Sequence, residues 1–230
     1  NSGGQCSTTS CNYQSYICEP NPQPSPPRLK ILCLHGGGQT AQSFQYDMFD
    51  LQSDLSHQFD FVFASAPYHY QLWMLDPPGG KDNPTNDSNW ASQSFQTLDN
   101  IIATQGPFHG IIGYSQGSAF TTVYLASRPN TFQVALMFCG YLPTTHLGLL
   151  NIVNNASPMN IHALIFMGEL DDIINNTQTD DQATKFSNPT IVRSPYTGHT
   201  LPATSNSSNS SVDPEANESN SSNSKRQKRL

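Results

Sequence analysis

The stretch GIIGYSQGSAF at residues 110–120 constrains the fold most, because it joins an apolar run to a helical pattern through a single serine. The residues before the serine form a short apolar run bounded by Gly and Pro, as buried parallel strands do. Residues 118–128 then place small and apolar side chains at helical spacing. A strand that turns at once into a helix needs small neighbours on both sides of the turn. Gly113 and Gly117 supply them, so Ser115 is predicted to lie in a sharp strand-to-helix turn.

Strand-like and helix-like segments alternate along the rest of the chain. Apolar runs with the length of buried strands lie at residues 29–38, 60–67, 132–143 and 161–172, and a weaker one at 190–199. Helical spacing marks residues 42–58 and residues 92–106, the second with Ser92 as a plausible N-cap. This order predicts the α/β class, with a doubly wound, mostly parallel sheet.

Composition limits the packed part of the chain to residues 29–202, read as one domain. Residues 1–28 are rich in Ser, Asn, Gln and Pro, and residues 203–230 are almost entirely Ser, Asn and charge. Such segments bury too little apolar area to offset the entropy of ordering the chain. Both are expected to be disordered, the second with a basic end, KRQKRL.

The charge balance argues against a nucleic-acid-binding protein. The chain has 17 Asp and Glu against 10 Lys and Arg, a formal net charge of −7, whereas phosphate binding needs clustered basic side chains. No apolar stretch approaches the roughly 20 residues of a membrane span, and no C-x-x-C spacing indicates a metal. We expect a cytoplasmic protein without metal or cofactor. The basic end could also be a nuclear signal, and secretion is left open.

Ser115, Asp171 and His199 each follow a predicted strand. In a parallel sheet the carboxyl ends of the strands meet at one edge, where chemistry collects. A serine hydroxyl needs a neighbouring base to become a nucleophile, and the imidazole base needs a carboxylate to fix its tautomer. These three residues are therefore the candidate catalytic triad. Asp172 competes with Asp171 for the acid role, whereas the glycine before His199 favours this histidine over the other six.

The first predicted strand ends in LHGGGQT, a histidine followed by three glycines. Consecutive backbone N–H groups in such a turn can point at a developing oxyanion. The turn lacks the lysine of a phosphate-binding P-loop and the glycine spacing of a dinucleotide loop. With a nucleophile downstream, the backbone N–H groups of Gly37 and Gln116 are the expected oxyanion-hole donors.

Taken together, ILCLHGGGQTAQSF, DFVFASAP, GPFHGIIGYSQGSA, IFMGELDDII and GHTLP resemble the FSH family of small serine hydrolases, within the α/β-hydrolase superfamily. The resemblance implies esterase or thioesterase activity on acyl substrates, with Ser115, Asp171 and His199 as the triad and no cofactor. It also implies that the aromatic-rich loop around Trp73 and Trp90 shapes the acyl site, beside His35.

Two departures from this family stand out. Family members usually have an aromatic residue where this chain has Gly37, and they usually close with a C-terminal helix for which residues 203–230 offer no apolar face. The leading hypothesis is a serine hydrolase that cleaves acyl esters through an acyl-enzyme. An acyl thioesterase is the near alternative. A catalytically idle binding module is the alternative from another class, suggested by the missing helix and the polar tails.

Overall fold

The protein was analysed as a computed structural model, which describes residues 9–11, 18–20, 27–76, 80 and 83–202. Near the N-terminus, β1 (Thr9–Cys11) pairs antiparallel with β2 (Cys18–Pro20). Of the segment at residues 1–28 and the tail at 203–230, both expected to be disordered, residues 1–8, 12–17, 21–26 and 203–230 lie outside the described residues. The expected disorder of these ends therefore stays a prediction.

Six parallel strands form the central sheet, which confirms the predicted class. They are β3 (Leu29–Leu34), β4 (Phe59–Ala64), β5 (Gly110–Tyr114), β6 (Val134–Phe138), β7 (His162–Gly168) and β8 (Thr190–Ser194). Their order across the sheet is β4-β3-β5-β6-β7-β8. The chain winds outward in one direction from β3 to β4 and in the other from β5 onward. The switch in direction lies between β3 and β5, and doubly wound sheets usually bind ligands at the carboxyl ends of the strands beside such a switch.

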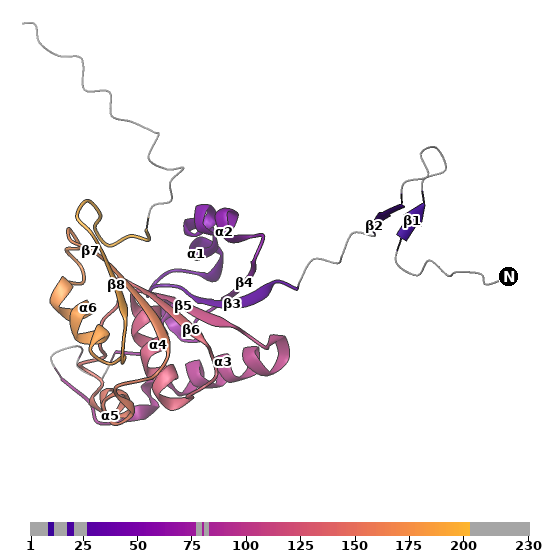
Figure 1. The fold of residues 1–230 in the computed structure, drawn as a ribbon. Helices are drawn as coiled ribbons and strands as arrows, with labels where there is room; N and C mark the ends of the chain where they lie inside the picture. Colours follow the sequence, from indigo (N-terminus) through magenta and orange to yellow (C-terminus); the bar gives the residue numbers. More distant parts are fainter. Residues whose placement is uncertain (1–8, 12–17, 21–26, 77–79, 81–82, 203–230) are drawn as a thin grey trace, which may run out of the picture.

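Helices cover both faces of this sheet (Figure 1). One face carries α1 (Ala41–Asp47) and α2 (Phe49–Leu55). The other carries α3 (Ser92–Gln105), α4 (Gln116–Ser127), α5 (Leu147–Ala156) and α6 (Asn176–Ala183). Two short 3₁₀ turns, His69–Gln71 and Ser88–Ala91, lie in the long loop between β4 and α3. The core is thus divided by the sheet into two clusters, with the larger on the α3–α6 face.

Two local predictions were wrong in detail. The single helix expected over residues 42–58 is two helices that meet at Met48, whose backbone leaves helical geometry at φ −89° and ψ 6°. The Met48 side chain at the break is buried, whereas no residue of α2 is buried. Ser92 is the first residue of α3 rather than its cap, because the Ser88–Ala91 turn leads directly into the helix.

A buried polar network joins α6 to α4. The carboxamide of Gln182 donates to the hydroxyls of Ser118 and Thr122 and to the Ser118 carbonyl, at 2.8–3.1 Å. One turn away, the Thr179 hydroxyl donates to the Gly140 carbonyl at 2.7 Å. Buried donors that are all satisfied fix one arrangement of the elements that carry them. The network therefore fixes α6 against α4.

The last described segment, residues 195–202, returns from β8 across the carboxyl edge of the sheet. Within the described residues no helix follows β8. None of the helices among them is long and apolar enough to cross a membrane.

Candidate active site

Ser115 lies in the sharp turn that its flanking glycines predict. Its backbone has φ 52° and ψ −119°, a left-handed region that non-glycine residues rarely enter, and its N–H donates to the Phe138 carbonyl at 2.9 Å. A Cβ on Gly113 would lie 2.6 Å from the Ser118 Cα, and one on Gly117 would lie 2.4 Å from the His35 carbonyl oxygen. Only glycine fits at either position, so the fold holds the strained serine between two close backbone approaches.

Asp171 is fixed in the loop after β7. One carboxylate oxygen, Oδ1, accepts the backbone N–H groups of Ile173 at 3.0 Å and Ile174 at 2.8 Å. The side chain is only 1% exposed. Neighbouring Asp172, by contrast, is exposed. Of the two candidate acids, only Asp171 therefore has its carboxylate held in one orientation.

His199 joins the other two candidates. Its Nδ1 lies 2.7 Å from Oδ2 of Asp171, and its Nε2 lies 3.0 Å from Oγ of Ser115. An ionised carboxylate only accepts hydrogen bonds, so Nδ1 carries the proton and Nε2 is left to accept from the serine hydroxyl. The sequence thus brings together, from three different strand ends, a serine, a base and an acid in one hydrogen-bonded chain.

Two side chains hold the backbone of the His199 loop. The Tyr114 hydroxyl donates to the His199 carbonyl at 2.7 Å, and the Cys139 thiol donates to the Thr200 carbonyl at 3.3 Å. Burial raises the pKa of the Tyr114 hydroxyl, and burial together with the Asp171 charge raises the pKa of the Cys139 thiol to about 12. Both groups therefore keep their protons and remain donors near neutral pH.

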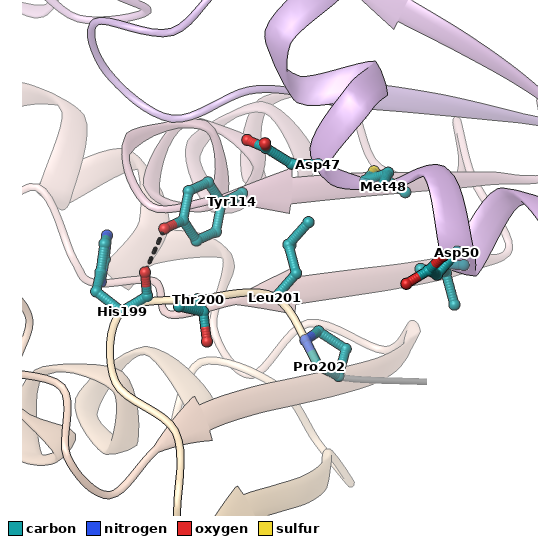
Figure 2. Close-up of a pocket in the computed structure, with 9 residues that line it drawn as sticks. Asp47, Met48, Asp50, Tyr114, His199, Thr200, Leu201 and Pro202 are labelled. Atoms are coloured by element: carbon teal, nitrogen blue, oxygen red, sulfur yellow. Dashed lines mark hydrogen bonds between the residues drawn. The ribbon is translucent and has the colours of Figure 1, made fainter. Parts of the chain in front are cut away.

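Figure 2 shows the cavity behind this loop, about 410 Å³ in volume. It lies between the α1–α2 corner and residues 199–202, and the Tyr114 hydroxyl bonds the His199 backbone at its edge. Asp47, Asp50 and Leu201 are among the residues that line it. The histidine loop therefore borders a cavity on this side, and the hydrogen bonds from Tyr114 and Cys139 add to the packing of Leu201 against the core and to the bond from the Leu170 N–H to the Thr197 carbonyl.

Removing the Tyr114 hydroxyl should leave the backbone of His199, the proposed base, less firmly held. We expect Tyr114→Phe to lower the free energy of unfolding by about 0.5–1.5 kcal/mol, the usual worth of one hydrogen bond, and to lower kcat several-fold through a less well placed His199. Urea unfolding and ester turnover measure the two effects. Tyr196→Phe is the matched control, since Tyr196 is 89% exposed and should change neither quantity. Equal effects of the two substitutions would contradict this role for Tyr114.

The glycine turn after β3 has one free donor. The Gly36 N–H donates to Oε1 of Gln39 at 2.9 Å, the Gly38 N–H to the Gln71 carbonyl at 3.3 Å, and the Gln39 N–H back to the Gly36 carbonyl at 3.2 Å. Within the described part of the chain, the Gly37 N–H has no hydrogen-bond acceptor, and neither has that of Gln116. A Cβ built on Gly37 would touch the Cβ of Gln116 at 3.5 Å. The two N–H groups expected to form the oxyanion hole are therefore free of other hydrogen bonds and lie close together.

The three aromatic residues expected to contact substrate lie at different depths. His35 and Trp73 are fully buried, so we revise their expected role from substrate contact to support of the turn above them. Trp90 is half-buried, and its indole N–H donates to the Thr85 hydroxyl at 3.3 Å. Its place in the acyl site stays a prediction. Burial of this kind leaves no signal in a loop sequence, because aromatic residues are common both in cores and at binding sites.

Among the described residues, one group of side chains could offer three ligands to a metal ion. Cys139, Asp171 and His199 have ligand atoms within 4.8 Å of one another. Two of them are already hydrogen-bonded to each other, and the raised pKa of the thiol disfavours the thiolate that a metal requires. The donor set is better explained by the hydrogen bonds than by a metal.

Comparison with solved structures gives the fold. The crystal structure of acyl-protein thioesterase 2 from Zea mays superimposes with a TM-score of 0.54 at 18% sequence identity, covering 76% of this chain and 87% of that one. At that identity the likeness concerns the fold alone, which is that of the α/β-hydrolases.

Comparison with known sequences gives the family. An esterase of Anopheles gambiae is 29% identical over 203 residues, which span 78% of this chain and 74% of that protein. Esterase OVCA2 of Xenopus tropicalis is 28% identical over 209 residues, 76% of this chain and 86% of that protein. The family model described as serine hydrolase (FSH1) matches residues 25–211, a span that contains the serine, the acid and the histidine described above. The chain therefore belongs to the FSH1 family of serine hydrolases.

Proposed function

We propose that the protein hydrolyses small or medium acyl esters through an acyl-enzyme formed on Ser115. The single observation that carries the proposal is the hydrogen-bonded chain from Oγ of Ser115 through His199 to Asp171, at 3.0 and 2.7 Å. In this chain each group can take the role that acyl transfer needs: nucleophile, base and orienting acid. Family membership and esterase relatives support ester hydrolysis more generally.

In the first half of the reaction, Oγ of Ser115 attacks the acyl carbonyl carbon while Nε2 of His199 takes the hydroxyl proton. Asp171, through its bond to Nδ1, stabilises the imidazolium that forms. The carbonyl oxygen becomes an oxyanion, for which the free N–H groups of Gly37 and Gln116 are the proposed donors. The intermediate then expels the alcohol, which takes the proton from Nε2.

In the second half, water attacks the acyl-enzyme in the same way. Nε2 of His199 takes a proton from this water, the two donors hold the second oxyanion, and the acid leaves as Ser115 recovers its proton. No step of this proposed mechanism needs a metal or an organic cofactor.

A fluorophosphonate probe tests the nucleophile directly. Such probes phosphonylate a serine only where a base activates it, so we expect stoichiometric labelling of Ser115 and none in Ser115→Ala. Mass spectrometry of the labelled peptide identifies the site, with a known serine hydrolase labelled in parallel as the control. Absence of label on Ser115, with the control labelled, would mean that Ser115 is not an activated nucleophile.

Thioester hydrolysis is a second candidate, since esters and thioesters pass through the same tetrahedral intermediate. The likeness to the fold of an acyl-protein thioesterase keeps this candidate open. Comparing kcat/KM for esters and thioesters of the same acyl group decides between them. The idle binding module is disfavoured, because a pure binder has no need of a strained serine hydrogen-bonded to a histidine.

A further inference from the structure

The carboxamide of Gln116 is fully engaged with the loop between β4 and α3. Its Oε1 accepts the backbone N–H of Trp73 at 2.7 Å, and its Nε2 donates to the Met74 carbonyl at 3.1 Å. A backbone donor and a backbone acceptor fix which end of the amide is which. The oxyanion role expected for this residue uses only its main-chain N–H, so these two bonds need an explanation of their own.

Trp73 links this loop to the residue that follows β3. Its indole N–H donates to the His35 carbonyl at 2.8 Å, and its own carbonyl accepts the Ser94 hydroxyl at 2.7 Å. The indole ring stacks on Phe120 of α4, with ring centres 5.9 Å apart and planes 5° from parallel. A fully buried residue whose indole N–H and backbone carbonyl are both hydrogen-bonded, and whose ring is stacked on another ring, is a rigid link.

His35 fixes the start of the glycine turn. Its Nε2 accepts the backbone N–H of Ala66 at 3.1 Å, which leaves Nδ1 as the proton carrier that donates to the Gly36 carbonyl at 2.7 Å. Burial lowers the pKa of this imidazole and so favours the neutral ring that both bonds require. The residue before Gly37 in the turn is therefore tied, through His35 and Trp73, to the side chain of Gln116.

We propose that the Gln116 side chain is a positioning residue that sets the oxyanion hole. It clamps the turn bearing the Gly37 N–H against the helix start bearing the Gln116 N–H. The two segments come from different strand ends, β3 and β5. A Cβ built on Gly37 would lie 3.4 Å from Leu72 of the clamped loop and 3.5 Å from the Cβ of Gln116, so the turn lies close to both. This inference rests on the proposed function. An oxyanion donor displaced by a fraction of an ångström loses much of its effect on the transition state and little of its effect on substrate binding.

Replacing the carboxamide by a thioether of similar length tests the clamp. Gln116→Met removes both side-chain bonds and keeps the backbone N–H. We expect kcat for a p-nitrophenyl ester to fall about 10-fold or more, with KM within two-fold. We also expect the inhibition constant of a simple alkyl boronic acid, which forms a tetrahedral adduct on a nucleophilic serine, to rise by the same factor.

Gln182→Met is the matched control, because it also breaks a buried carboxamide network but touches none of the turn. It should lower the melting temperature and leave kcat and the boronate inhibition constant unchanged. If Gln116→Met does not fold, Trp73→Phe takes its place, since the only hydrogen bond that it removes is the one from the indole N–H to the His35 carbonyl. We then expect kcat to fall about five-fold and the boronate inhibition constant to rise by the same factor.

The outcomes separate this inference from the function on which it rests. A wild-type enzyme that turns over ester and binds boronate, with Gln116→Met indistinguishable from it or altered in KM alone, would overturn the clamp and leave the proposed function standing. A folded wild-type protein with no turnover and no probe label on Ser115 would overturn both. A parallel loss in Gln182→Met would show a general packing effect and would also overturn the clamp.

Discussion

Replacing Asp171 by Asn should lower kcat by about 10⁴-fold, the loss that this exchange causes in a serine protease triad. The Asn carbonyl can still accept the N–H groups of Ile173 and Ile174, so the loop should keep its shape. The amide group would then face Nδ1 of His199 as a donor and force the imidazole proton onto Nε2. A base protonated on the side that faces Ser115 cannot accept the hydroxyl proton.

Asp172→Asn is the control for this prediction, since the exposed Asp172 side chain makes no bond to His199 among the described residues. Its kcat should stay within a few-fold of wild type. Steady-state turnover of one soluble ester measures both variants, with circular dichroism to verify that each is folded. Comparable losses in the two variants, or a larger loss in Asp172→Asn, would move the carboxylate role to Asp172.

The sequence was sufficient to predict the sheet and to single out three residues that lie in one hydrogen-bonded chain, and the reason is physical. A parallel strand is buried on both faces, so it appears as an unbroken apolar run that ends abruptly at glycine or at a polar loop. β5 and β7 have this form, and β3 has it after Lys30. Residues just beyond such runs must converge where the carboxyl ends of the strands meet. The sequence alone was therefore enough to predict that Ser115 and Asp171 lie close together.

Features that depend on contacts between distant segments could not be predicted. The break at Met48 is decided by how α1 packs on the sheet, because the spacing of Phe44, Met48 and Leu51 suits one continuous helix equally well. The burial of Trp73 is decided by Phe120, which lies 47 positions along the chain. The bonds from Gln116 to Trp73 and Met74 likewise span more than 40 residues. Such pairings leave no periodicity in a single sequence.

The steric surroundings of Gly37 do not require a glycine. A Cβ built there would lie 3.4 Å from Leu72 and 3.5 Å from the Cβ of Gln116, which is ordinary packing distance. The Gly37 backbone also lies outside the left-handed region that favours glycine. Neither the turn nor its neighbours therefore require glycine at this position. The turn is held by the bonded N–H groups of the residues on either side of Gly37 rather than by its flexibility.

Gly117 is the opposite case, and the two glycines form a matched pair. A Cβ on Gly117 would lie 2.4 Å from the His35 carbonyl oxygen and 2.5 Å from that of Leu34. Both are backbone atoms at the carboxyl end of β3, so they cannot move aside as a flexible side chain could. We expect Gly117→Ala to cost more than about 4 kcal/mol of unfolding free energy, the range of severe core defects. Gly37→Ala should instead leave stability unchanged or raise it by up to about 1 kcal/mol, because alanine restricts the unfolded chain.

Urea unfolding of the two variants beside wild type measures both free energies of unfolding. A Gly117→Ala protein that is insoluble on expression would agree with the expected loss of stability. A Gly117→Ala protein as stable as wild type would mean that α4 does not start against the end of β3, and the close approach on which the strained Ser115 turn depends would be wrong.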